Sequence, residues 1–127
     1  MISPPIVAAV DDDQDMRRSL ETLIEHAGCR ACLFEDAKAF LEWNVAHKAK
    51  CIVSDIQMPG MTGLELCTRL TRGGDRTPII LMSAFATVPM RQRAMAAGAH
   101  TFLAKPIDVG TFLDLLESIM SSPTEVS

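Results

Sequence analysis

Five polar side chains that could carry out phosphoryl transfer each follow a short apolar run, in segments that lie far apart in the chain. They are Asp11, Asp12, Asp55, Ser83 and Lys105. Three carboxylates that converge would repel one another, and a divalent cation bound between them would relieve that repulsion. Hard oxygen ligands with room left for water favour magnesium over zinc. The residue types therefore predict an acidic, metal-binding pocket with a hydroxyl group and an ammonium group beside it.

Asp55 is the best candidate for a nucleophile in such a pocket. A carboxylate that accepts a phosphoryl group gains about two negative charges and several acceptor oxygens. A divalent cation, the ammonium group of Lys105 and the hydroxyl group of Ser83 could bind those oxygens as charge develops. Phosphoryl transfer of this kind depends on positioning and electrostatics and places little demand on acid–base groups. Taken alone, Asp55 could equally cap the turn at residues 58–60, so the prediction depends on the other strand ends.

These side chains can meet only if the apolar runs lie in one parallel sheet, whose strands end at the same edge. Several of the runs are apolar on both faces, as is typical of strands buried between helices. Segments with helical periodicity alternate with the runs. The alternation predicts an α/β fold with a five-stranded, doubly wound parallel sheet and five helices. The expected strands are 6–10, 30–34, 51–55, 79–83 and 101–104, and the expected helices begin near residues 16, 36, 63, 89 and 109.

Length and composition limit the classes of protein to which the chain can belong. A chain of 127 residues, of which 48% are hydrophobic, can build one domain with its own core. We expect that domain over residues 6–120, a tail over 1–5, and a polar tail or the start of a linker over 121–127. The net charge of −4 argues against nucleic-acid binding by this domain. No apolar run approaches the roughly 18 residues of a membrane span and no signal peptide is evident, so we expect a cytoplasmic location without membrane contact.

The four cysteines do not form a recognisable redox or zinc motif. Cys29 and Cys32 have the CxxC spacing, but no second such pair follows, and the three histidines stand at no ligand-like distance from it. The residues around Cys32 are typical of a strand, whereas a reactive thiol favours the start of a helix. We therefore interpret the cysteines as core or surface thiols.

The motifs at the strand ends resemble those of the receiver domain of two-component response regulators, which has the CheY-like (flavodoxin-like) fold with strand order 2-1-3-4-5. The resemblance covers roughly residues 6–120. Segments 58–66 and 88–99 are most similar to the FixJ-type subgroup. The matching motifs are VDD at 10–12, SDIQMPGMTG at 54–63, LMSA at 81–84, GA at 98–99 and FLAKP at 102–106.

The resemblance implies that Asp55 is the phosphoacceptor and receives its phosphoryl group from the phosphohistidine of a sensor histidine kinase. It implies that Mg²⁺ (or Mn²⁺) is bound by Asp55, directly by Asp12, largely through water by Asp11, and by the main-chain carbonyl of Gln57. The chain would then be a signalling domain rather than an enzyme, although it would catalyse its own phosphorylation and dephosphorylation.

The same resemblance assigns a phosphoryl-binding role to Lys105, to the Ser83 hydroxyl group and to the backbone N–H of Ala84. It implies a cis peptide bond between Lys105 and Pro106, which would fix the turn that aims the lysine. It also implies a switch in which Ser83 moves toward the phosphoryl group and the ring of Phe102 fills the vacated space. The alternative is that Phe102 is an ordinary core aromatic residue.

Output is implied at the face formed by the fourth helix, the fifth strand and the fifth helix. The resemblance implies a homodimer through that face, and control of transcription through a DNA-binding domain outside this chain.

The helix at 89–97 has only a thin apolar stripe, so we expect weak packing and an easily shifted equilibrium. Arg91 and Arg93 place charge on this helix, which disfavours dimerisation through it. The loop at 85–87 replaces a segment that is usually glycine-rich and polar in the subgroup.

Three other functions share parts of this pattern. A phosphatase of the haloacid-dehalogenase type would need a second aspartate two positions after Asp55, where Gln57 stands. A flavin-binding module of the same fold would need a hydroxyl-rich phosphate loop, whereas the acids at 11–15 would repel phosphate. A degenerate receiver that acts only as a protein-binding module remains open, although no residue needed for phosphotransfer is missing.

Overall fold

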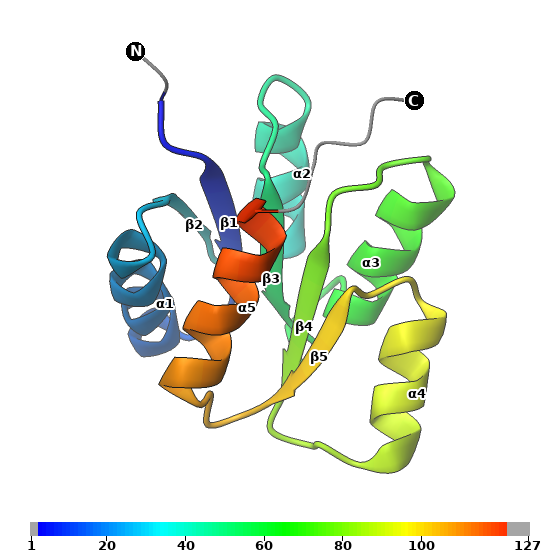
Figure 1. Cartoon of the computed structure of the whole chain (residues 1–127). Helices are drawn as coiled ribbons and strands as arrows, with labels where there is room; N and C mark the ends of the chain where they lie inside the picture. Colours follow the sequence, from blue (N-terminus) through cyan, green and yellow to red (C-terminus); the bar gives the residue numbers. More distant parts are fainter. Residues whose placement is uncertain (1–2, 122–127) are drawn as a thin grey trace.

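The computed structural model describes residues 3–121, which form three layers with a parallel sheet between two layers of helices (Figure 1). The strand order is β2-β1-β3-β4-β5, and all neighbouring strands are parallel. The predicted fold class is therefore confirmed. The elements are β1 (Ile6–Val10), α1 (Gln14–His26), β2 (Arg30–Phe34), α2 (Ala37–Asn44), β3 (Cys51–Asp55), α3 (Gly63–Arg72), β4 (Ile79–Ser83), α4 (Val88–Ala96), β5 (Thr101–Ala104) and α5 (Val109–Ser121).

The core consists of two clusters of apolar side chains, one on each face of the sheet. On one face, side chains of α1 and α5, such as Leu20 and Phe112, pack against β1, β3 and β4. On the other face, α2, α3 and α4 contribute side chains such as Phe40 and Leu66. Every residue of β3 and of β4 is buried, because these central strands are covered by helices on both sides. The central strands thus form a rigid support for the residues at their carboxyl ends.

Polar side chains cap the starts of four helices and place the strand-to-helix loops. Asp13, Asp36 and Thr87 each accept a hydrogen bond from a backbone N–H in the first turn of α1, α2 and α4, respectively. Thr62 and Glu65 form a capping box at the start of α3, in which each side chain accepts a hydrogen bond from the other residue's backbone. These caps satisfy N–H groups that have no partner within the helix. They fix the chain on the edge of the sheet where the predicted site lies.

The boundaries differ from the sequence expectations in small ways at the C-terminal half. α4 begins at Val88, one residue before the proline expected to start it, because Pro89 occupies the first turn and Thr87 is the cap. α5 ends at Ser121, one residue into the expected C-terminal tail. The rest of that tail, residues 122–127, and the first two residues of the N-terminal tail lie outside the described residues.

α4 has the thin apolar face that its sequence predicts. Ala94 is its only fully buried residue, and Val88 and Met95 are exposed. A helix that buries so little apolar surface is held to the sheet by few contacts.

Within residues 3–121, no helix combines the length and apolar character needed to cross a membrane.

Candidate functional site

The side chains singled out in the sequence gather at the edge of the sheet where the parallel strands end. Asp11 directly follows β1, and Asp55 and Ser83 are the last residues of β3 and β4. Lys105 directly follows β5. The strand register brings these ends level, since Asp55 pairs with Met82 and Ser83 pairs with Ala104. The topology therefore brings together residues separated by up to 94 positions.

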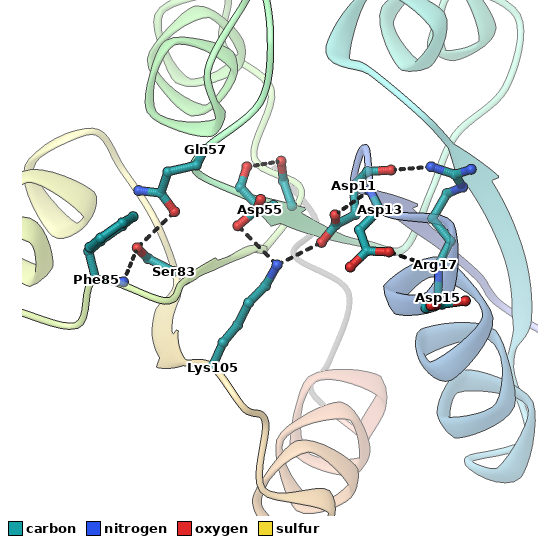
Figure 2. Close-up of polar contacts among 10 residues, drawn as sticks. Asp11, Asp13, Asp15, Arg17, Asp55, Gln57, Ser83, Phe85 and Lys105 are labelled. Carbon is teal, nitrogen blue, oxygen red and sulfur yellow. Dashed lines mark hydrogen bonds and ion pairs between the residues drawn. The ribbon is translucent and has the colours of Figure 1, made fainter.

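Lys105 connects two of the acids (Figure 2). Its Nζ donates a hydrogen bond to Asp11 Oδ2 at 3.0 Å and forms an ion pair with Asp55 Oδ1 at 3.3 Å. The Asp11 side chain is fully buried, and those of Asp55 and Lys105 are 8% and 20% exposed. The Lys105–Pro106 peptide bond is cis. One ammonium group thus neutralises part of the charge on two buried carboxylates.

Asp11 is held on its other side by contacts at the start of α1. Its Oδ1 accepts a hydrogen bond from the backbone N–H of Asp13 at 2.9 Å. Its main-chain carbonyl accepts one from Arg17 Nη1 at 2.6 Å (Figure 2). Sequence reasoning did not assign a role to Arg17, although its position one turn into the helix after the acid pair places it within reach. These contacts leave Asp11 little freedom to turn away from the site.

The environment of Asp55 disfavours its ionised form. Burial raises the pKa of Asp55, and although the charge of Lys105 lowers it, the nearby charges of Asp11 and Asp12 raise it further. The pKa of Lys105 is also raised: burial alone would lower it, but the hydrogen bond and charge of Asp11 and the charge of Asp55 outweigh burial. The ammonium group therefore stays charged, and the carboxylate charge remains only partly compensated.

The acids fit a small divalent cation. One carboxylate oxygen from each of Asp11, Asp12 and Asp55 can be chosen so that all three lie within 4.8 Å of one another. Asp11 and Asp55 are buried, whereas Asp12 is exposed, so that a bound ion would keep access to water. An all-oxygen donor set that leaves room for water suits Mg²⁺ or Mn²⁺ better than zinc. Gln57, whose main-chain carbonyl was expected to bind the ion, follows two residues after Asp55.

Ser83 lies in the site but is hydrogen-bonded to residues other than the acids. Its Oγ donates to Gln57 Oε1 at 2.9 Å and accepts from the backbone N–H of Phe85 at 2.9 Å (Figure 2). Ala84, whose N–H was expected to bind the phosphoryl group, is exposed directly after β4. Sequence reasoning assigned a role only to the main chain of Gln57 and missed its side chain, because no spacing rule links it to a residue 26 positions away.

Phe102, the expected partner of Ser83 in the switch, is buried on β5 with 2% of its surface exposed. The Arg91 guanidinium carbon lies 5.2 Å from the centre of its ring, which is cation–π geometry. Arg91 belongs to α4 and was expected only to add charge to the surface. Its contact connects α4 to the switch candidate on β5.

We expect Asp55→Asn to stabilise the metal-free protein increasingly as the pH rises. Because the native pKa of Asp55 is raised, the folded state binds more protons than the unfolded state, and ionisation destabilises the fold. The penalty begins above the unfolded pKa of about 4 and is complete above the native pKa. Asparagine avoids this penalty, so the variant should gain stability relative to wild type as the pH rises from about 4 toward neutrality. Urea unfolding with a chelator at several pH values measures the difference, and a pH-independent difference would contradict the prediction.

Comparison with known proteins shows which family the chain is similar to. Residues 7–117 match the family model described as the response regulator receiver domain. The chain is 38% identical over 112 residues to the transcriptional regulatory protein FixJ of Bradyrhizobium diazoefficiens. The matched region covers 88% of this chain and 55% of that protein. It is 38% identical over 109 residues to nodulation protein W of the same organism, and the matched region covers 86% of this chain and 48% of that protein.

Solved structures give the same result. The crystal structure of FixJ-N is similar with a TM-score of 0.85 and 28% identity, covering 98% of this chain and 100% of that one. The response regulator StyR is similar with a TM-score of 0.78 and 40% identity, covering 91% of this chain and 59% of that one. The chain spans about half the length of FixJ and of nodulation protein W.

Proposed function

Because the chain belongs to the response regulator receiver domain family, we propose that it accepts a phosphoryl group on Asp55 from a sensor histidine kinase and relays the signal to an output. The observation that carries this proposal is the contact of Lys105 with both Asp11 and Asp55 at the edge of the sheet. A surface carboxylate that merely capped a turn would not need a buried acid and a shared ammonium group beside it.

The transfer is a displacement at phosphorus. A carboxylate oxygen of Asp55 attacks the phosphorus atom, and a new O–P bond forms as the P–N bond of the donor phosphohistidine breaks. The electron pair of the broken bond stays on the imidazole nitrogen, and Asp55 becomes an acyl phosphate. The domain thus promotes its own phosphorylation and, later, the hydrolysis of the acyl phosphate by water. It remains a signalling domain rather than an enzyme with a separate product.

The residues around Asp55 bind and orient the incoming group. Asp11 holds the ammonium group of Lys105 in place. The ammonium group could therefore give up its contact with the Asp55 carboxylate and bind a phosphoryl oxygen instead. The hydroxyl group of Ser83 and the N–H of Ala84 would bind further oxygens. Asp11, Asp12, Asp55 and the Gln57 carbonyl would hold Mg²⁺ or Mn²⁺, which supplies charge stabilisation for the transferring group.

The output follows from the elements next to Ser83. Movement of Ser83 and repacking of Phe102 would alter the face formed by α4, β5 and α5, through which the domain would contact a partner or a second copy of itself. Arg91 contacts the ring of Phe102 and so connects α4 to it, and through this contact repacking of Phe102 could displace α4.

The relatives named as transcriptional regulators support control of transcription by a DNA-binding domain outside this chain, in the cytoplasm. The net charge of −4 argues against nucleic-acid binding by this domain itself.

Incubation with Mg²⁺ and acetyl phosphate, followed by intact-mass measurement, tests the proposal. We expect the wild-type chain to gain one phosphoryl group, and Asp55→Asn to gain none because an amide is not a nucleophile at this step. Asp114→Asn changes an exposed acid on α5 and serves as the matched control, which should behave like wild type. Equal phosphoryl gain by Asp55→Asn and wild type would refute the assignment of Asp55.

A further inference from the structure

The hydroxyl group of Ser83 is fully engaged by neighbours other than Asp55. Ser83 is completely buried. Its single hydroxyl proton is donated to the side-chain carbonyl oxygen of Gln57, and its oxygen accepts the N–H of Phe85. Figure 2 shows these two contacts on one side of Asp55 and the contacts of Lys105 on the other. The group expected to detect the phosphoryl group is therefore already bound to another acceptor.

We propose that the Gln57 side chain is a positioning residue that holds the Ser83 hydroxyl group away from the phosphoryl site and thereby sets the energy needed to switch the domain. A hydroxyl group has one proton and can donate it to one acceptor at full strength. Gln57 Oε1 and a phosphoryl oxygen are both acceptors, so Ser83 cannot fully serve both. This inference rests on the proposed function, since it concerns the response of Ser83 to a group on Asp55.

The backbone around Gln57 holds the side chain next to Ser83. The N–H of Ile56 donates to the carbonyl of Met82 at 2.8 Å, so the pairing of β3 with β4 continues one residue past Asp55. The carbonyl of Ile56 accepts the N–H of Gly63 at 3.0 Å, which ties the loop to the start of α3. Because Asp55 pairs with Met82, Ile56 lies level with Ser83. Gln57 is the next residue along the chain, so the backbone from which it extends is fixed close to Ser83. The contact is a product of the sheet register rather than of a freely moving loop.

The released side chain would have space to occupy near α4. Gln57 lines a cavity of about 670 Å³ together with Leu64 of α3 and Met90 and Arg93 of α4. When Ser83 turns to a phosphoryl oxygen, the Gln57 amide loses its partner on Ser83 and can turn into this cavity. Its new contacts would then include α4, the helix with the smallest buried face in the output region. Release of Gln57 thus couples the hydroxyl group to α4 by a route separate from Phe102.

Gln57→Met tests the proposal, because methionine has a similar length and no strong acceptor. Beryllofluoride, a mimic of the phosphoryl group, is titrated in saturating Mg²⁺ and followed by amide NMR shifts. Removing a bond that binding must break should tighten beryllofluoride affinity, by about two- to tenfold for one hydrogen bond. If Gln57 instead helped to bind the mimic directly, the same variant would weaken it, so the sign of the change separates the two roles.

The Ser83→Ala background is the matched control. Without the hydroxyl group there is nothing for Gln57 to hold, so adding Gln57→Met to Ser83→Ala should leave beryllofluoride affinity unchanged. In the absence of the mimic, Ser83→Ala should shift the side-chain amide signals of Gln57, and beryllofluoride should shift them in the wild-type protein. A purely structural role of Gln57 would instead change the beryllofluoride affinity equally with and without the Ser83 hydroxyl group.

The outcomes separate this inference from the proposed function. Equal or weaker beryllofluoride binding by Gln57→Met, with a normal wild-type response, would refute the positioning role and leave phosphorylation of Asp55 intact. An equal gain in the Ser83→Ala background would also refute it. A wild-type chain that does not bind beryllofluoride in Mg²⁺, and is indistinguishable from Asp55→Asn, would overturn both.

Discussion

Replacing Lys105 with methionine is expected to lower the free energy of unfolding of the metal-free protein by about 2–3 kcal/mol at neutral pH. The variant leaves the buried carboxylates of Asp11 and Asp55 without the ammonium group that contacts both of them. Removal of one partner from a fully buried pair typically costs about 3–5 kcal/mol. The Lys105 side chain is 20% exposed, so water screens part of its charge and a smaller loss is expected.

The loss should depend on pH in a defined direction. The native pKa of Lys105 is raised, so the stability that its charge contributes is present below the unfolded pKa of about 10.4 and is lost as the pH rises through the native value. The difference between the variant and wild type should therefore be constant over neutral pH and shrink at high pH. It should also shrink at low pH, where Asp55, whose native pKa is raised, becomes protonated. Mg²⁺ should restore part of the stability, because a cation bound by the acids replaces the missing positive charge.

Urea unfolding with and without Mg²⁺ measures this effect, and Lys48→Met provides the comparison. Lys48 is also paired with an aspartate, Asp75, but at 4.0 Å and with 78% of its side chain exposed. An exposed pair of this kind contributes about 0–1 kcal/mol. If Lys105→Met were no less stable than Lys48→Met, the contact with two buried acids would not contribute as argued.

The fold and the meeting of the site residues could be predicted because each depends on a repeated local signal. The apolar runs at 51–53 and 79–82 need no side-chain detail to be interpreted as buried strands, and parallel strands share one edge. Asp55 and Lys105 are brought together by this topology alone. The positions of strand ends are therefore the most predictable part of the site.

The network of side-chain contacts within the site could not be predicted in the same way. Gln57 and Ser83 meet because of the register between β3 and β4, and the acceptor that the hydroxyl group selects is decided by competition among several nearby oxygens. The contacts of Arg17 with the Asp11 carbonyl and of Arg91 with the Phe102 ring depend on rotamers of long, flexible side chains. No periodicity or spacing in the sequence encodes these choices.

Adding a single methyl group at Gly63 is expected to destabilise the protein strongly and to disturb Asp55, the proposed phosphoacceptor. A Cβ atom on Gly63 would collide with the main-chain oxygen of Asp55 and lie 2.9 Å from the Cα of Ile56. Both are backbone atoms at the end of a buried central strand, so neither can move without displacing the strand. Overpacking at a rigid site typically costs about 1–3 kcal/mol, and a backbone collision of this kind should reach about 3 kcal/mol or more.

Gly63→Ala is therefore expected to show a lower midpoint of urea unfolding and, where the protein remains folded, slower phosphoryl uptake from acetyl phosphate. Gly110→Ala is the matched control, because its added Cβ on α5 would find only Asp108 Oδ2 nearby, at 3.7 Å. Alanine favours the helix over glycine by about 1 kcal/mol, so this control should be slightly stabilised and should accept the phosphoryl group normally. The opposite signs of the two glycine substitutions follow from space alone, since both add the same methyl group at the first or second residue of a helix. Equal stability of the two variants would mean that α3 does not pack closely against the carbonyl of Asp55, and that β3 fixes the orientation of Asp55 without help from the helix that follows it.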